Sequence, residues 1–187
     1  MRAKEGFSRL IEDYDVPLSV NQLLAERKKA VPQIMRSTTL YPQAKSCLER
    51  LSHYDLAIAT SSGKSYLQTL MKRFGLKDEF TALVSGSEVK AAKPSPDLFI
   101  KAAEMMRTAP ECCAVIEDAP NGIIAAKRAG TVAIALRTTT EERYFSGEAE
   151  ADLVIDGLDD LNNAAIKKAE NKARIRWQLE EQGGETK

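Results

Sequence analysis

Two adjacent carboxylates, Glu117 and Asp118, close an apolar run in this 187-residue sequence and precede a helix that we expect to open at Gly122. A buried strand holds such side chains rigidly, and the loop after it can present them to a hard cation, which prefers oxygen ligands. The alternative is that both acids only cap the helix, since carboxylates are common at helix starts. The pair by itself leaves both interpretations open.

A second segment carries hydroxyl groups where a strand is expected to end. The apolar run 56–59 is followed by Thr60, Ser61 and Ser62. Side-chain O–H and backbone N–H groups at this position can point at an anion where the next helix begins. The segment is therefore a candidate phosphate-binding loop.

A third segment holds a lysine between two alanines and a turn with two prolines. Pro94 favours an extended backbone at Lys93, and we expect Ser95 to cap the following helix with Pro96 at its first position. Most single lysines are solvated surface charges. A lysine restrained in this way is instead a candidate for a fixed cation beside a phosphate.

These three segments resemble the haloacid dehalogenase superfamily of phosphatases, in particular the members with a small helical cap. Among them are β-phosphoglucomutase, the sugar-phosphate phosphatases and the pseudouridine 5'-phosphatases. The matching residues are Thr60 at the end of a strand, Lys93 in a K-P-x-P-D turn, and Glu117 with Asp118 in an E-D-[AS]-x-x-G run. The last motif is specific enough to make a chance match improbable.

The resemblance implies a role for each of these residues. Thr60 and Ser61 would hold the phosphoryl oxygens, and Lys93 would neutralise charge on the phosphoryl group. Asp118 and Glu117 would bind Mg²⁺, the cofactor that the family uses. The catalytic assignments are therefore Lys93 and Thr60, and the nucleophile is absent from the chain.

The family's nucleophile segment, D-x-D-G-T, has no counterpart in this sequence. Its first aspartate attacks phosphorus, and its second acts as acid and base. Asp13 and Asp15 form a D-x-D, but Val16 and Pro17 follow, and the apolar residues ahead of the pair have helical spacing. We expect this pair to lie at a helix end and the chain to begin after the nucleophile strand.

The resemblance places that absent strand in the centre of the sheet, between the strands at Leu56 and Val115. Its loss would open two apolar strand edges, and buried backbone groups without partners cost about 1 to 3 kcal/mol each. We expect the chain to be unstable or repaired. Repair would come from closure of the gap, a strand donated by a partner, self-association through the edges, or an upstream segment.

The order of apolar runs and helical patterns predicts an α/β fold with a Rossmann-like parallel sheet and flanking helices. We expect a partial helical cap at 1–40, in which Pro32 interrupts or kinks the chain, a core at 41–165 and a charged helical tail at 166–187.

Lys plus Arg equal Asp plus Glu at 27 each, which favours neither nucleic acid nor an anionic membrane as a binding partner. Three cysteines without metal or disulfide spacing, and no signal segment, indicate the cytoplasm.

Three functions follow from these patterns. The first is the body of a Mg²⁺-dependent phosphatase that hydrolyses a phosphomonoester through an aspartyl-phosphate in its full-length form and is inactive as given. The second is a pseudoenzyme that binds a phosphorylated ligand without turnover, and the third is an α/β scaffold. The expected ligand is a small phosphorylated metabolite, either a sugar phosphate or a nucleotide-like molecule. A phosphatase is preferred to a mutase because nothing in the predicted cap marks a second role in which a residue would reprotonate the product.

Overall fold

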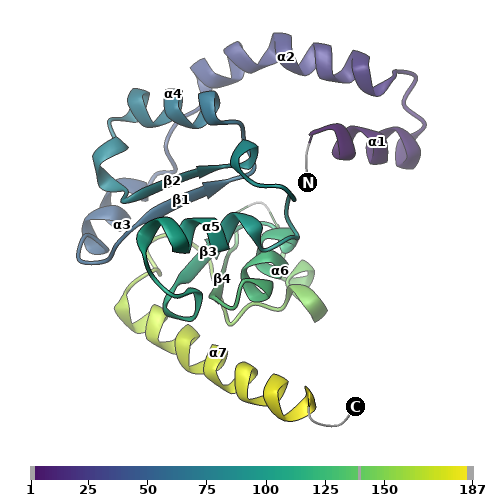
Figure 1. Cartoon of the computed structure of the whole chain (residues 1–187). Helices are drawn as coiled ribbons and strands as arrows, with labels where there is room; N and C mark the ends of the chain where they lie inside the picture. Colours follow the sequence, from purple (N-terminus) through teal and green to yellow (C-terminus); the bar gives the residue numbers. More distant parts are fainter. Residues whose placement is uncertain (1–2, 139, 185–187) are drawn as a thin grey trace.

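The computed structural model describes residues 3–138 and 140–184, and it has the predicted α/β architecture with parallel strands between two layers of helices (Figure 1). The strands are β1 (Ala57–Thr60), β2 (Ala82–Ser85), β3 (Ala114–Glu117), β4 (Val132–Leu136) and β5 (Leu153–Ile155). The helices are α1 (Ala3–Tyr14), α2 (Val20–Ser37), α3 (Ala44–Arg50), α4 (Lys64–Phe74), α5 (Asp97–Met106), α6 (Pro120–Arg128) and α7 (Asn163–Gly184).

The sheet is divided into two parts. Strand β1 pairs in parallel with β2, and β3, β4 and β5 form a second parallel group in that order. Within the described residues, neither β1 nor β3 has a strand on its other edge. The predicted gap between the Leu56 strand and the Val115 strand is therefore present, and it has not closed by direct pairing.

Successive side chains of the strands point to opposite faces of the sheet, and each face packs against a layer of helices. On one face, Ala59 and Val84 pack against α5, and Ala133 packs with residues of α6. On the other face, Ile58 packs against α4, and Ile134 packs with residues of α3 and α7. The apolar runs of the sequence thus form the centre of the protein.

Two helices connect the separated parts of the sheet. On one face, α5 packs Leu98 with Val84 of β2, while its neighbouring residue Phe99 packs with the β4 residue Ala133. On the opposite face, α3 places Leu48 in the cluster beneath α4 and β1, and its C-cap residue Leu51 in the cluster of β4 and α7. Both helices therefore contact the strands on either side of the gap.

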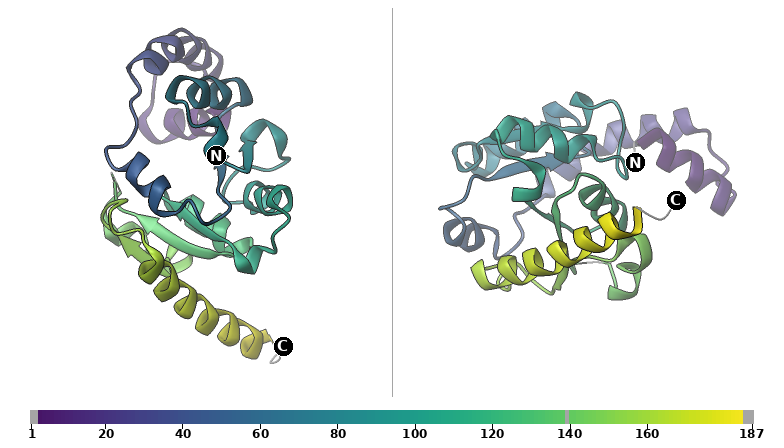
Figure 2. Two further views of the ribbon diagram at one scale, coloured as in Figure 1. Left: turned by 90° about the vertical axis from the view of Figure 1, so that its left-hand side faces the viewer. Right: turned by 60° about the horizontal axis from the view of Figure 1, so that its bottom comes forward.

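The N-terminal helices α1 and α2 lie apart from the sheet and pack against each other (Figures 1 and 2). Neither contains a buried residue. Pro32 was predicted to interrupt or kink the chain, and the interruption is wrong, because helix α2 continues through this residue. Arg73 of α4 donates hydrogen bonds to the carbonyls of Met35 and Arg36, which anchors the end of α2 to the core.

Asp13 and Asp15 lie at the end of α1, as predicted, and Asp15 has a left-handed backbone with φ of 48°. They therefore lie at the end of a helix and not at the end of a buried strand. None of the helices among residues 3–138 and 140–184 is long and apolar enough to cross a membrane.

The C-terminal helix α7 begins at Asn163, ahead of the predicted start at Ile166. It lies along β4 and β5, and Trp177 packs against their apolar cluster. Arg176 donates two hydrogen bonds of 3.0 Å to the buried carboxylate of Asp152, and a third of 3.1 Å to the carbonyl of Thr131. The charged tail is thus attached by a buried ion pair as well as by apolar packing.

Candidate functional site

Lys93 and Glu117 are in direct contact. The Lys93 ammonium donates a hydrogen bond to the carboxylate of Glu117, although the two residues are 24 positions apart. Their side chains are only 10% and 12% exposed. The ammonium also lies 4.7 Å from the centre of the Phe99 ring, a distance at which the ring face attracts a cation. The lysine of the proline turn and the first acid of the carboxylate pair therefore form a largely buried ion pair.

Glu117 lies against the first turn of α6, where the chain needs a glycine. A Cβ atom at Gly122 would lie 2.2 Å from the Glu117 carboxyl carbon, so any larger residue would displace that carboxylate. The helix itself begins at Pro120, not at Gly122 as predicted, and its N-cap residue Ala119 provides no side-chain hydrogen bond. Neither Glu117 nor Asp118 therefore caps α6 by a side-chain hydrogen bond that the structure describes.

Asp118 directly follows β3 and is exposed. Its carboxylate forms no hydrogen bond or ion pair with any residue that the structure describes. No group of three or more His, Cys, Asp or Glu side chains within the described ranges could hold a metal ion. Mg²⁺ in phosphate sites is commonly held by one or two carboxylates, with waters and substrate oxygens completing its shell. Asp118 with Glu117 fits that small donor set.

The turn that carries Lys93 is stabilised by the side chain of Asp97. Its carboxylate accepts a hydrogen bond of 2.5 Å from the Ser95 hydroxyl and one of 3.1 Å from the backbone N–H of Ala91. The bond from Ser95 is the main reason that the pKa of Asp97 is below its usual value. Helix α5 begins at Asp97 with Pro96 as N-cap, so the predicted cap and first helical position were each one residue too early.

Thr60 ends β1, and its hydroxyl accepts a hydrogen bond of 3.2 Å from the backbone N–H of Ser62. The loop that follows Thr60 approaches the residue after β2 closely. Gly86 donates a backbone hydrogen bond of 3.0 Å to the Ser62 carbonyl, and a Cβ atom at Gly86 would lie 2.6 Å from the Ser61 carbonyl oxygen. The backbone of the candidate phosphate loop is therefore held by a glycine that directly follows the neighbouring strand β2.

Replacing Gly86 by Ala should displace the Ser61 backbone, because the clashing atoms belong to the main chain and cannot rotate away. We expect the free energy of unfolding to fall by about 1 to 3 kcal/mol, the usual cost of overpacking. Gly157→Ala is the matched control, since the nearest atom to its added Cβ would be 3.9 Å away. Urea denaturation of both variants checks this; equal stability of the two would contradict the close approach.

A capping box at the end of β2 supports the same loop from the other side. Glu88 accepts hydrogen bonds from the Ser85 backbone N–H and hydroxyl, and these bonds lower the pKa of Glu88 to about 2. Its ionised carboxylate pairs at 3.1 Å with Lys64, in the first turn of α4. Gly86 and Glu88 were not predicted to support the site, although the pattern S-x-x-E at Ser85 is a recognisable capping-box signal.

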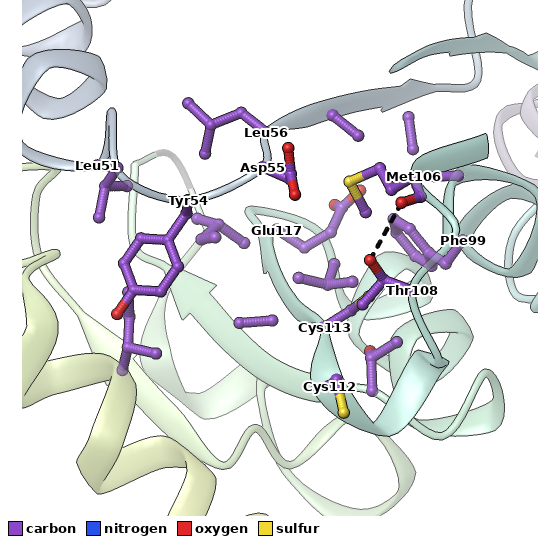
Figure 3. A pocket seen from close by; sticks show the side chains of 18 residues that line it. Leu51, Tyr54, Asp55, Leu56, Phe99, Met106, Thr108, Cys112, Cys113 and Glu117 are labelled. Carbon is purple, nitrogen blue, oxygen red and sulfur yellow. Dashed lines mark hydrogen bonds between the residues drawn. The ribbon is translucent and has the colours of Figure 1, made fainter. Parts of the chain in front are cut away.

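A cavity of about 430 Å³ lies in the gap between β1 and β3 (Figure 3). Residues 54–57 and Ala59 line one side and residues 112–117 the other, while Phe99 and Met106 of α5 close a flank. Glu117 is thus the predicted site residue that lines the cavity directly. Thr60 ends the strand that forms the facing wall, and Ser61 follows it. The structure thus brings Lys93 and Glu117 into contact, whereas the hydroxyl loop lies at the end of β1, across the gap from β3.

The sequence is similar to those of known proteins. The family model described as haloacid dehalogenase-like hydrolase matches residues 2–136. A bifunctional riboflavin kinase/FMN phosphatase of Arabidopsis thaliana is 31% identical over 160 residues, which cover 84% of this chain and 42% of that protein. The β-phosphoglucomutase of Bacillus subtilis is 31% identical over 137 residues, covering 73% of this chain and 58% of the relative.

The fold is shared with solved structures. The crystal structure of CbbY from Rhodobacter sphaeroides in complex with phosphate superposes with a TM-score of 0.73 at 24% identity, covering 89% of this chain and 78% of that one. This likeness concerns the fold. The chain spans only about half the length of the two curated relatives named above, at 42% and 58%.

Proposed function

This chain belongs to the haloacid dehalogenase-like hydrolase family, and we propose on that basis that it forms the body of a Mg²⁺-dependent phosphatase site for a small phosphorylated metabolite. The observation that carries the proposal is the contact between Lys93 and Glu117. It joins the proline-turn lysine to the carboxylate pair at the end of β3. A fixed cation beside carboxylates is the arrangement that a phosphoryl group and a divalent cation need together.

Each residue of the proposed site has a separate task. The Lys93 ammonium neutralises charge on the phosphoryl group, and Phe99 and Glu117 keep it in place. The hydroxyl and backbone groups of Thr60 and Ser61 bind phosphoryl oxygens at the end of β1. Gly86 keeps that loop close to β2.

We assign the cation to the carboxylates that follow β3. Asp118, which is exposed, would hold Mg²⁺, with Glu117 as the second carboxylate. When bound, Mg²⁺ supplies positive charge that stabilises the charge developing on the phosphoryl oxygens. Removing the cation with EDTA should therefore weaken the binding of phosphate, because the carboxylates would then repel the anion.

We further propose that the helices within 1–40 act as a partial cap, which selects the organic part of the substrate, and that 41–165 is the core. The names of the relatives include phosphatases for FMN, for pseudouridine 5'-phosphate and for fructose 1-phosphate. A nucleotide-like molecule and a sugar phosphate are therefore both suitable substrates for a first screen. The same proposal places the protein in the cytoplasm, where such metabolites occur.

A second candidate is a pseudoenzyme that binds a phosphorylated ligand without turnover. It is favoured by one observation, the absence of a D-x-D-G-T segment from the 187 residues. Asp13 and Asp15 do not replace that segment, since they end a helix that contains no buried residue. We expect no hydrolysis by these residues alone.

Calorimetric titration separates both of these candidates from a scaffold function. The chain is titrated with MgCl₂, then with a phosphomonoester, and hydrolysis is followed in the same samples. Binding without hydrolysis is the result expected for the chain alone and for a pseudoenzyme. If neither Mg²⁺ nor the phosphomonoester binds, both candidates are wrong and only a scaffold function remains.

A further inference from the structure

The hairpin formed by α1 and α2 carries apolar stripes that the described part of the chain does not bury, and we propose that they form a binding face for a second copy of this chain. The hairpin lies apart from the sheet (Figure 2). The inference concerns assembly and does not depend on the proposed phosphate site.

Both helices of the hairpin are amphipathic. Each has apolar residues at helical spacing, at positions 7, 10, 11 and 14 of α1 and at positions 20, 23, 24, 31, 34 and 35 of α2. The two helices pack against each other, yet Leu10 is 38%, Tyr14 75% and Ile34 50% exposed. Because most of the stability of such a helix comes from packing its apolar face, these stripes favour a further partner.

The end of α1 is acidic. Its last turn contains Glu12 and Asp13 and no basic residue, and Asp15 follows the helix. Negative charge is unfavourable there, because the free carbonyl groups form the negative end of the helix dipole. None of these three acids forms an ion pair with a residue that the structure describes. The end of α1 therefore lacks the cation that both its side chains and its dipole favour.

The middle of α2 is basic. Arg27, Lys28 and Lys29 are consecutive and exposed. Lys29 pairs with Glu26 at 2.7 Å. Arg27 and Lys28, by contrast, take part in no ion pair within residues 3–138 and 140–184. The hairpin thus has unpaired cations as well as unpaired carboxylates.

These charges cannot meet within one hairpin. Arg27 is seven residues after Val20, the first residue of α2, which places it about 10 Å along the helix from the turn between the helices. Asp13 lies beside that turn, at the end of α1. A pair between Asp13 and Arg27 therefore needs two chains.

The pattern is complementary to itself. Asp13 is three residues after Leu10, so the two lie on one side of α1, and Arg27 is four residues after Leu23, on one side of α2. A two-fold axis through the apolar part of the face brings Asp13 of each copy to Arg27 of the other. Such an isologous contact pairs both charges and covers the leucines. The partner that fits this face is therefore a second copy.

Sedimentation velocity of the full 187-residue chain over a range of concentrations tests the inference. We expect a dimer that forms as the concentration rises. Asp13→Lys and Arg27→Glu should each raise the dissociation constant by about tenfold or more, because each dimer would contain two like-charged contacts in place of two ion pairs. Circular dichroism verifies that both variants, which alter exposed residues, remain folded.

Mixing the two variants gives the sharpest result. A heterodimer of Asp13→Lys with Arg27→Glu contains one Lys–Glu pair and one original Asp–Arg pair, so it should form with about the affinity of the unaltered dimer. An affinity tag on one variant measures capture of the other. Without capture of the untagged variant, the proposed pairing of Asp13 with Arg27 is wrong.

Two further variants locate the contact. Arg174→Glu is the matched control, since Arg174 is an exposed arginine on α7 and should not affect the dimer. Ile116→Lys places a charge beside the free edge of β3 and should not affect it either. The inference is wrong if the chain stays monomeric at every concentration, if Arg174→Glu and Arg27→Glu act equally, or if only Ile116→Lys abolishes association.

Discussion

Replacement of Lys93 by Met is expected to weaken phosphate binding by about 10- to 100-fold, the loss that follows from removing one charge-assisted hydrogen bond. Methionine keeps the apolar stem beside Phe99 but removes the ammonium. The carboxylate of Glu117, which is 12% exposed, then lacks its cation. Because an uncompensated buried charge is costly, we also expect the free energy of unfolding to fall by about 3 kcal/mol.

A double variant separates the two effects of this change. Lys93→Met combined with Glu117→Gln removes both charges, so most of the stability should return while phosphate binding stays weak. Lys101→Met is the control, since Lys101 on α5 is exposed and its pair with Glu104 spans 3.9 Å. Recovery of phosphate affinity together with stability would show that Lys93 acts only in the fold.

The largest loss of stability is expected at Arg176. Asp152 is 3% exposed and Arg176 is 15% exposed, and truncation of the arginine leaves a buried carboxylate with the Ala133 N–H as its remaining recorded donor. We expect Arg176→Ala to lower the free energy of unfolding by about 3 to 5 kcal/mol, the usual cost of breaking a buried ion pair. Urea denaturation followed by circular dichroism measures this.

A neighbouring arginine provides the control for that experiment. Arg174 pairs with Glu170 on the exposed face of α7, and such surface pairs contribute at most about 1 kcal/mol. The double variant Asp152→Asn with Arg176→Met should be more stable than Arg176→Ala alone, because no buried charge remains. Equal effects of Arg174→Ala and Arg176→Ala would contradict the buried network.

Much of the fold could be predicted because apolar runs and helix ends are local signals. The runs at Leu56 and Val115 became β1 and β3, and Gly75 ends α4 with the left-handed φ of 66° that a glycine C-cap adopts. The gap in the sheet was also predictable. It followed from the resemblance to a family whose central strand has no counterpart in the sequence.

Other features depend on contacts that no local pattern contains. Arg176 and Asp152 are 24 residues apart, and the charged pattern of the tail gives no indication that one arginine is buried. Pro32 suggested a break or a kink, but α2 continues from Val20 to Ser37 through this proline. Gly86 is required because a loop on another strand approaches it, which only the folded chain reveals.

The candidate site was predicted as residue types but not as geometry. The motifs identified Lys93 and Glu117, yet their spacing in the chain did not show that the two would bind each other rather than a ligand. Likewise, the sequence did not show that Gly122 makes room for the Glu117 carboxylate. Side-chain partners at a site are set by how loops meet at the sheet edge, and this requires the tertiary structure.

The central claim is that one phosphate site is formed by the loops after β1 and β3 together with the lysine turn. Titration of the ¹⁵N-labelled chain with inorganic phosphate in the presence of MgCl₂ tests it most directly by NMR. We expect the amide signals of Ser61, Lys93 and Asp118 to shift together with one dissociation constant. Shifts confined to a single loop, or signals at these residues that do not respond while others do, would contradict it.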